Sequence, residues 1–417
     1  MGRKRPCATT APTNITAFRT AERAWKSPSF DLSLAFDASQ IVWEVQGEDG
    51  KTRGIWTAGD GTTEECWKVS LGDLADSGMG QSRWKGKDKE NERDYAVIVP
   101  RIPGLVLFPS ILSESLQREL VVETLQNARR PNLTNLDAFY KLPEGGLWKA
   151  WSSGRGEEVV PSLLGDGVAS SRGNSPNGSG SDQTLAPSRC ATPLIRVAKE
   201  VSVDAAGERK EITVREMLPK LRWSNVGYHY NWTTKLYEFD RGFIPLPPLV
   251  LRCCRDIVRA MPWAAVFNNS HSGEPTQSRN MGTENWTRWN EDYEPDAGII
   301  NFYQAKDSLT GHTDHSEKDA TRPLVSFSLG HSSVFLVGGI TRDVPPLAIL
   351  LRSGDGLCMS GPGRLAFHGL PRVLAGTLPS FLAADQADEV RGTENWTPYG
   401  EYLERGARIN VNVRSVF

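Results

Sequence analysis

The stretch from Asn301 to Glu317, NFYQAKDSLTGHTDHSE, holds the residues most able to do chemistry. It contains a His-x-Asp pair, His312 and Asp314, and a separate histidine, His368, follows far downstream. Two imidazoles and one carboxylate are the usual ligands of a non-haem Fe(II) centre with open positions for oxygen and a co-substrate. Alternate residues of a strand share one face, so His312 and Asp314 can point at the same ion. The sequence therefore predicts a metal site formed by these three side chains.

The run RINVNVR, from Arg408 to Arg414, predicts a strand with two different faces. One face is apolar, and the other carries Arg408, Asn410, Asn412 and Arg414. A strand that buries apolar side chains and aims two guanidinium groups from its other side is suited to binding carboxylates.

Taken in order, these residues resemble the AlkB family of Fe(II)- and 2-oxoglutarate-dependent dioxygenases. The shared pattern is Asn301-Phe302-Tyr303, His312-x-Asp314, His368 and Arg408-x-Asn410-x-x-x-Arg414. Five further segments resemble the branch called AlkB homologue one: LRWSNVGYHYNW (221–232), PLVSFSLG (323–330), FLVGG (335–339), SGDG (353–356) and MSGPGRLAFHGLPRVL (359–374). The resemblance spans most of the chain and is strongest from residue 221 to the end.

This resemblance implies that His312, Asp314 and His368 bind Fe(II), and that 2-oxoglutarate and O2 fill the open positions. Oxidative decarboxylation of 2-oxoglutarate would then accompany hydroxylation of a methyl group. An N-methyl base would release formaldehyde, whereas a carbon-bound methyl would remain as hydroxymethyl. We expect Arg414 to pair with the distal carboxylate of 2-oxoglutarate, because guanidinium geometry matches a carboxylate. The same pocket would be lined by Asn301, Tyr303, Arg408 and Asn410.

Residues 223–237, WSNVGYHYNWTTKLY, resemble the family's substrate lid. Interleaved aromatic and basic residues suit stacking on an extruded base, and a packed core segment is the competing interpretation. The expected base contacts are Tyr228, His229, Tyr230, Trp232 and Arg364.

Several residues depart from the bacterial pattern or stand outside the site. Asn412 replaces the usual threonine, and Ser316 replaces an acidic base-contacting residue, so a preference for cationic alkylated bases is not implied. We interpret His315 and His331 as ordinary surface or core histidines.

The leading hypothesis is an oxidative demethylase of nucleic-acid bases. Its expected substrates are tRNA, carrying N1-methyladenine or 5-methylcytosine, and DNA carrying N6-methyladenine. A protein hydroxylase or histone demethylase on the same scaffold is the alternative, and a non-catalytic interaction module is a third possibility.

Composition narrows the class of protein. The 417 residues are 39% hydrophobic and 24% charged with a net charge of -2, which describes a globular protein without a general excess of basic charge. The six cysteines show no C-x-x-C spacing, so neither zinc nor a disulfide framework is indicated. No apolar run approaches a membrane span. The basic start MGRKRP is similar to a mitochondrial presequence or a nuclear signal, and equally to a frayed basic terminus. We expect an intracellular monomer, located in the nucleus, cytoplasm and/or mitochondrion.

The predicted fold class is α+β, with a double-stranded β-helix, or jelly-roll, core and a helical or irregular N-terminal extension. We expect a partly disordered extension at 1–94, with a short helix near 17–26, and the start of the catalytic region at 95–151. The Ser- and Gly-rich segment 152–190 predicts a disordered insertion. Residues 191–417 then form the jelly roll, with a lid near 221–240, because short β-branched and aromatic runs separated by turns fill this region.

Overall fold

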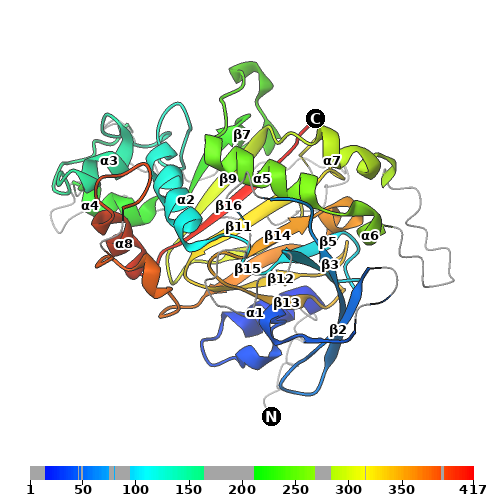
Figure 1. Ribbon diagram of the computed structural model, residues 1–417. Helices are drawn as coiled ribbons and strands as arrows, with labels where there is room; N and C mark the ends of the chain where they lie inside the picture. Colours follow the sequence, from blue (N-terminus) through cyan, green and yellow to red (C-terminus); the bar gives the residue numbers. More distant parts are fainter. Residues whose placement is uncertain are drawn as a thin grey trace, which may run out of the picture.

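The computed structural model describes residues 15–45, 47, 50–74, 79, 94–163, 211–267, 283–314, 316–386 and 389–417. Within these ranges, two antiparallel sheets pack against each other as a jelly roll (Figure 1). The larger sheet has ten strands in the order β1-β2-β3-β4-β5-β14-β11-β16-β9-β6, and the smaller has four in the order β10-β15-β12-β13. The fold class predicted for the core is thus observed.

The strands of the larger sheet are β1 (Val42–Trp43), β2 (Thr52–Thr57), β3 (Thr63–Ser70), β4 (Tyr95–Ile98), β5 (Leu105–Phe108), β6 (Trp223–Gly227), β9 (Ala297–Tyr303), β11 (Leu324–Gly330), β14 (Gly356–Met359) and β16 (Arg408–Arg414). The smaller sheet contains β10 (Leu309–His312), β12 (Ser333–Val337), β13 (Leu347–Leu351) and β15 (His368–Val373). A separate hairpin joins β7 (Tyr230–Asn231) to β8 (Leu236–Tyr237).

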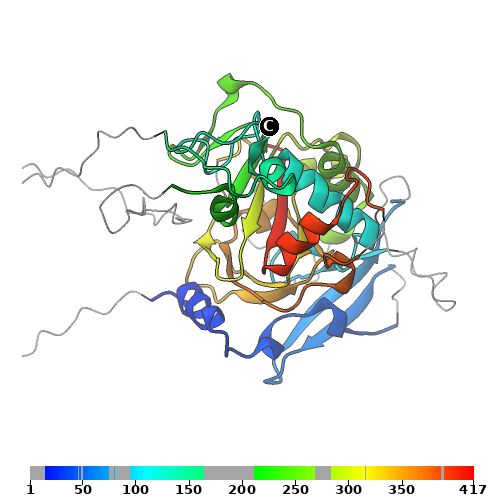
Figure 2. The same ribbon diagram turned by 90° about the vertical axis from the view of Figure 1, so that its left-hand side faces the viewer.

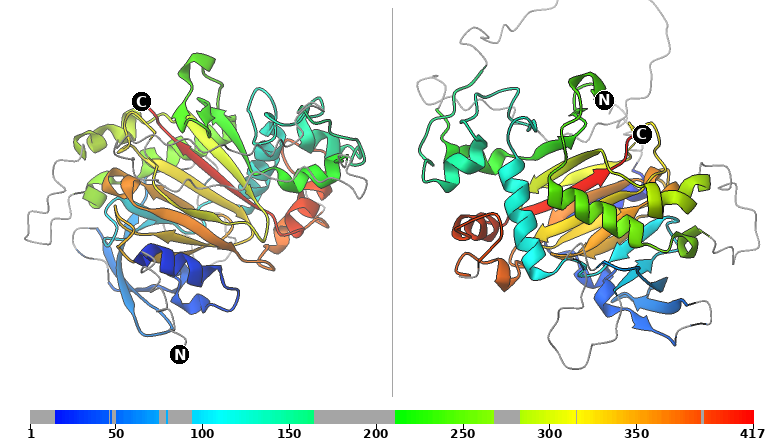
Figure 3. Two further views of the ribbon diagram at one scale, coloured as in Figure 1. Left: turned by 180° about the vertical axis from the view of Figure 1, so that it is seen from behind. Right: turned by 45° about the horizontal axis from the view of Figure 1, so that its top comes forward.

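Two long helices, α2 (Glu114–Asn127) and α5 (Pro248–Ala260), cross the outer face of the larger sheet (Figures 1 and 3). Ser113 caps α2 by accepting the Leu116 N–H at 3.3 Å, and α5 begins at Pro248, where the missing N–H of proline leaves no helical hydrogen bond unmade. Shorter helices complete the described chain: α3 (Gly146–Ser152), α4 (Val214–Met217), α6 (Trp263–Phe267), α7 (Trp289–Asp292) and α8 (Thr397–Glu404).

Strand β16 lies inside the larger sheet, between β11 and β9, with unbroken pairing to both. Its Ile409, Val411 and Val413 are fully buried toward α2 and α5, so the predicted alternation is confirmed. Its polar face is therefore turned toward the smaller sheet, where a charged side chain needs a partner.

The N-terminal region has more sheet structure than its sequence predicted. Helix α1 (Ala17–Lys26) forms as expected and covers the outer face of the smaller sheet (Figure 3). The strands β1 to β3 were not expected, and they extend the larger sheet beyond β4. Between α1 and β1, the fully buried Phe36 forms backbone hydrogen bonds with Ala348 and Leu350 of β13. Residues 15–74 thus add to both sheets rather than forming a separate irregular extension.

Part of the predicted insertion can be compared with the structure. Residues 152–163 are described and include backbone bridges such as Tyr140 to Ser162 and Val159 to Thr213. The rest of the predicted disordered insertion, 164–190, lies outside the described residues, as do 1–14 and most of 75–93. In the described parts of the chain, every helix falls short of the length and apolar character needed to traverse a bilayer.

Candidate active site and metal centre

His312, Asp314 and His368 come together at one end of the smaller sheet. Each offers one ligand atom, and these atoms all lie within 4.8 Å of one another. His312 is paired with His368 across β10 and β15, and their ring centroids are 4.4 Å apart. Asp314 follows just after the end of β10, with its Oδ1 3.7 Å from Nε2 of His312. The predicted His-Asp-His cluster is therefore present.

The backbone fixes which nitrogen of each histidine faces the cluster. Nδ1 of His312 lies 3.0 Å from the carbonyl of Thr310, and Nδ1 of His368 lies 3.0 Å from that of Ala366. A carbonyl can only accept, so each Nδ1 carries the proton and donates it. Each Nε2 lone pair is then free for a metal, in the arrangement that orients histidine ligands in metal sites.

The electrostatics favour the protonation states that bind a cation. Burial raises the pKa of the Asp314 carboxyl, but Arg414 and the two imidazoles together hold it well below its usual range. Burial, reinforced by His312, lowers the pKa of His368 to about 4. At neutral pH the cluster therefore presents a carboxylate and a neutral His368, as a divalent metal requires.

A cavity of about 130 Å³ adjoins the cluster and is lined by both sheets and the hairpin β7–β8. Opposite the histidines, β9 contributes Asn301 and Tyr303, and β16 contributes Arg408 and Asn410. The two strands are paired so that Arg408 faces Tyr303 and Asn410 faces Asn301. The four residues expected to share one pocket thus line the same wall.

Arg408 is a buried cation with spare donors. Its side chain is 1% exposed, and Nη2 donates to Oγ of Ser328 at 2.8 Å. Nε and Nη1 have no hydrogen-bond partner in the described chain. Burial lowers its pKa to about 10, so it remains charged at neutral pH. A buried guanidinium with two unused donors fits a ligand carboxylate.

Arg414 has a different environment from the one expected. Its Nη1 lies 2.9 Å from Oδ2 of Asp314 and 2.6 Å from Oε1 of Glu317, and Nη2 donates to Oδ1 of Asn412 at 2.8 Å. Arg414 lines the cavity, but protein oxygens already engage both Nη atoms of its guanidinium, so its contact with the distal carboxylate stays a prediction. Arg408 keeps two nitrogens without a partner in the described chain and is the better placed of the two arginines for that contact.

The expected base contacts fall into two groups. Tyr230 and Trp232 line the cavity, and Trp232 packs against Trp223 with ring centroids 5.3 Å apart. Tyr228 and His229 do not line it, so their contact with a base stays a prediction. The ring of Tyr228 packs against Phe239, and Nδ1 of His229 lies 2.9 Å from the side-chain nitrogen of Asn225. Part of the lid segment is thus packed core, as the competing interpretation held.

Arg364, the remaining expected base contact, also lies away from the cavity lining, so its contact with a base stays a prediction. It is fully buried behind Asp314, does not line the cavity, and donates from Nε to the carbonyl of Arg322 at 3.1 Å. His331 lies 3.1 Å from the carbonyl of Leu403 through Nε2, as a core histidine should. His315 lies outside the described residues.

Sequence reasoning missed several side chains of the cavity wall. The most important is Glu317, three residues after Asp314, whose carboxylate also contacts Arg414. A second acidic residue beside the metal motif was the available signal. Tyr237, the last residue of the predicted lid segment, also lines the cavity, as do Phe335 and Arg342, which nothing in their local sequence marks.

Comparison with known proteins identifies the family. A sequence profile described as the 2OG-Fe(II) oxygenase superfamily matches residues 187–414. The chain belongs to this superfamily. This oxygenase is 35% identical over 214 residues to nucleic acid dioxygenase ALKBH1 of Homo sapiens, covering 48% of each chain. It is 33% identical over 328 residues to the Mus musculus protein of the same name, covering 75% of this chain and 64% of that one.

A third relative of the oxygenase is the tRNA demethylase abh1 of Schizosaccharomyces pombe, 28% identical over 321 residues, with coverage of 76% of this chain and 80% of that one. These relatives confirm the resemblance to the AlkB family and its homologue one branch. The oxygenase spans about half of the human relative and under two thirds of the mouse relative. The family implies Fe(II) and 2-oxoglutarate, and the His-Asp-His cluster has the donor set for the metal.

Proposed function

We propose that this oxygenase is an Fe(II)- and 2-oxoglutarate-dependent oxidative demethylase of nucleic-acid bases. The observation that carries the proposal is a single cavity. It is bounded on one side by His312, Asp314 and His368, and on the other by the guanidinium of Arg408, whose Nε and Nη1 have no partner in the described chain. The three side chains would hold Fe(II) through two Nε2 atoms and one carboxylate oxygen. When bound, the metal with 2-oxoglutarate and O2 would supply the oxidation of a substrate methyl group.

Arg408 would receive the distal carboxylate of 2-oxoglutarate. Nε and Nη1 have unused donors for a charge-assisted hydrogen bond to a carboxylate, and Ser328 fixes the third nitrogen, Nη2. Tyr303, whose ring lies 5.5 Å from the guanidinium carbon of Arg408, would donate a hydrogen bond from its hydroxyl to the same carboxylate. Burial raises the pKa of Tyr303 to about 12, so the hydroxyl keeps that proton. A dianion bound here would also compensate a buried positive charge.

The hairpin β7–β8 would hold the base. Tyr230, Trp232 and Tyr237 form an aromatic wall over the mouth of the cavity, and the indole N–H of Trp232 is buried without a partner in the described chain. Aromatic faces stack on any base, and an unused donor can meet an acceptor on its edge. Closing the site around an extruded base would also exclude water from the metal.

The names of the relatives favour nucleic acid as the substrate class. Besides the tRNA demethylase of fission yeast, the chain is similar to a protein of Arabidopsis thaliana named DNA N(6)-methyladenine demethylase ALKBH1A, at 27% identity over 319 residues. We therefore propose methylated tRNA, with N1-methyladenine or 5-methylcytosine, and N6-methyladenine in DNA as the substrates to test first.

The test is nucleoside mass spectrometry of methylated tRNA and DNA after incubation with the protein, Fe(II) and 2-oxoglutarate, with formaldehyde measured in parallel. We expect loss of a methylated nucleoside, or gain of its hydroxymethyl form, only when both Fe(II) and 2-oxoglutarate are present. The matched control is His312→Ala, which removes a ligand. The proposal is contradicted if turnover of every nucleic acid equals that of this control. If a methylated peptide is turned over instead, the protein is a protein demethylase or hydroxylase.

A further inference from the structure

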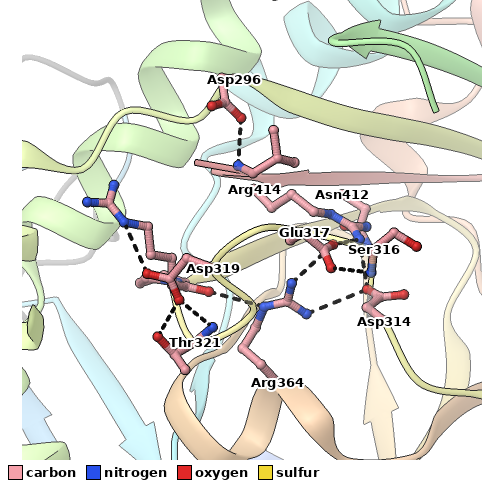
Figure 4. A network of polar contacts seen from close by, with 12 residues as sticks. Asp296, Asp314, Ser316, Glu317, Asp319, Thr321, Arg364, Asn412 and Arg414 are labelled. Carbon is pink, nitrogen blue, oxygen red and sulfur yellow. Dashed lines mark hydrogen bonds and ion pairs between the residues drawn. The ribbon is translucent and has the colours of Figure 1, made fainter. Parts of the chain in front are cut away.

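Four charged side chains form a buried cluster at the wall of the cavity: Asp314, Glu317, Arg364 and Arg414 (Figure 4). Their side-chain exposures are 14%, 1%, 0% and 6%. Arg414 lies 2.9 Å from Asp314 and 2.6 Å from Glu317. Arg364 lies 3.6 Å from Asp314 and 3.2 Å from Glu317. Each guanidinium therefore contacts both carboxylates.

The charges of this cluster balance only when Glu317 is counted. Asp314 alone would face two guanidinium groups in a region shielded from water, and an unpaired buried charge is strongly destabilising. Nη1 and Nη2 of Arg364 have no hydrogen-bond partner in the described chain, so proximity to the two carboxylates is what compensates them. Glu317 therefore supplies the second negative charge that the two arginines require.

The two oxygens of Asp314 have different surroundings. Oδ2 is the atom that contacts Arg414 and Arg364, whereas Oδ1 is directed at Nε2 of His312. With Oδ2 engaged by cations, one oxygen remains for a metal. Arg414 shares a single nitrogen, Nη1, between the carboxylates of Asp314 and Glu317. The strength of the ion pair between Arg414 and Oδ2 of Asp314 therefore depends on Glu317.

Glu317 is held so that it can perform this task. Its Oε2 accepts the N–H of Ser316 at 3.1 Å, while Oε1 contacts both arginines. The hydroxyl of Ser316 donates to the carbonyl of Lys235 in the lid hairpin at 2.8 Å, which anchors the loop. With both oxygens engaged, the carboxylate is not available to contact a base.

We propose that Glu317 is a positioning residue: it balances Arg364 and Arg414 so that Asp314 is a one-oxygen ligand of the metal. This inference rests on the metal site of the proposed function. It assigns Glu317 no contact with metal or substrate. It gives Arg364 a role in the charge balance.

The test is metal binding by Glu317→Gln, which keeps the shape of the side chain and removes its charge. The matched control is Asp319→Asn, which neutralises a carboxylate of the same loop that pairs with Arg322, at 3.7 Å, instead of with the cluster (Figure 4). Mn(II) alone is titrated into the metal-free proteins, and the visible spectrum of the Co(II) forms reports the coordination. We expect Glu317→Gln to weaken Mn(II) binding about 10- to 100-fold and to change the Co(II) spectrum, with Asp319→Asn near wild type.

A second variant keeps the proposal testable if Glu317→Gln is poorly folded. Glu317→Gln with Arg364→Met removes one charge of each sign, so Mn(II) affinity should recover toward wild type and the Co(II) spectrum should return. A double variant that binds no better than Glu317→Gln overturns the charge-balance argument. The same is true if Glu317→Gln binds Mn(II) with wild-type affinity and an unchanged Co(II) spectrum. Failure of the wild-type protein to bind Mn(II) or Co(II) would instead overturn the proposed function.

Discussion

Glu22 of α1 accepts a hydrogen bond from the N–H of Gly311, at 2.9 Å, so the N-terminal helix is bonded to the residue that precedes His312. The Glu22 side chain is 4% exposed and is also paired with Arg19 at 2.5 Å. Phe18, one turn earlier, packs its ring against Gly311, where an added Cβ would lie 2.3 Å from a ring carbon. The pairing of β10 with β15 shifts register between Leu309 and His312, and α1 satisfies the backbone there.

Replacing Glu22 with alanine should therefore destabilise the protein. The change leaves the Gly311 N–H buried without an acceptor, and the expected loss is about 1–3 kcal/mol in the free energy of unfolding. Denaturant titration measures this loss. The control is Glu44→Ala, which breaks an exposed pair with Arg53 and should cost under about 1 kcal/mol. Equal losses in the two variants would contradict the contact.

Arg408→Met should raise the KM for 2-oxoglutarate about 10- to 100-fold, because a charge-assisted contact to its carboxylate is lost. Mn(II) affinity should stay near wild type, since Arg408 does not contact the metal ligands. Arg408→Lys should not restore the KM, because an ammonium group cannot reproduce the donor geometry of a guanidinium. Arg372→Met, which removes another buried arginine outside the cavity wall, serves as the control. If Arg408→Met has a wild-type KM for 2-oxoglutarate, another residue binds the distal carboxylate.

His368→Ala should abolish retention of Fe(II), whereas His331→Ala should retain it. Both histidines are buried, but only His368 belongs to the three-residue cluster. Metal analysis after anaerobic loading and desalting makes the comparison. Equal iron content in the two variants would show that the cluster is not the metal site.

Trp232→Ala should raise the KM for nucleic acid about 10-fold or more, because base stacking on an aromatic ring contributes about 1–3 kcal/mol. Turnover of 2-oxoglutarate without substrate should be unchanged. Phe243→Ala is the control, since Phe243 is 48% exposed and packs on Tyr228 away from the cavity. If Phe243→Ala has the larger effect, the base lies on the outer aromatic surface instead.

Asp296 should make the stability depend on pH. Burial raises the pKa of its carboxyl from 3.8 to about 6. The folded protein therefore binds this proton more tightly than the unfolded chain, and the stabilisation is complete below pH of about 4 and lost as the pH rises through about 6. The Asp296→Asn variant would keep one side-chain oxygen to accept the Val416 N–H, which Asp296 accepts at 2.8 Å.

The stability of Asp296→Asn relative to that of the wild-type protein should therefore increase as the pH rises from about 4 to about 7. The expected gain is about 1–2 kcal/mol in the free energy of unfolding, because solvent screens part of the charge of a carboxyl that is not fully buried. Denaturant titration across this pH range measures it. A difference between the two proteins that stays constant with pH would contradict the shift.

Local patterns predicted much of the fold. Alternation along Arg408–Arg414 identified β16 and its two faces, and helical spacing near 17–26 identified α1. Each of these elements is encoded in consecutive residues whose periodicity is visible in the sequence. Strands β1–β3 escaped prediction because their pairing partners, not their own composition, make them part of the sheet.

The site was predictable in its ligands and less so in its surroundings. His312, Asp314 and His368 followed from residue type and order, but the roles of Arg408 and Arg414 could not be separated. Both arginines lie on one face of one strand, and which of them is occupied depends on Asp314 and Glu317, about a hundred residues away. The contact between Glu22 and Gly311 spans 289 positions and leaves no local trace.

The two histidine ligands and Arg408 belong to different sheets, so the metal site and the co-substrate contact can be lost separately when the protein is destabilised. His312 and His368 are joined to each other by the pairing of β10 with β15, while Arg408 lies on β16, which belongs to the larger sheet (red strand in Figure 2). Loosening of the packing between the sheets would therefore move Arg408, and the 2-oxoglutarate that it binds, away from the metal before the metal ligands separate from one another. On heating, or in a variant with a cavity between the sheets, 2-oxoglutarate-dependent activity should be lost before iron is released.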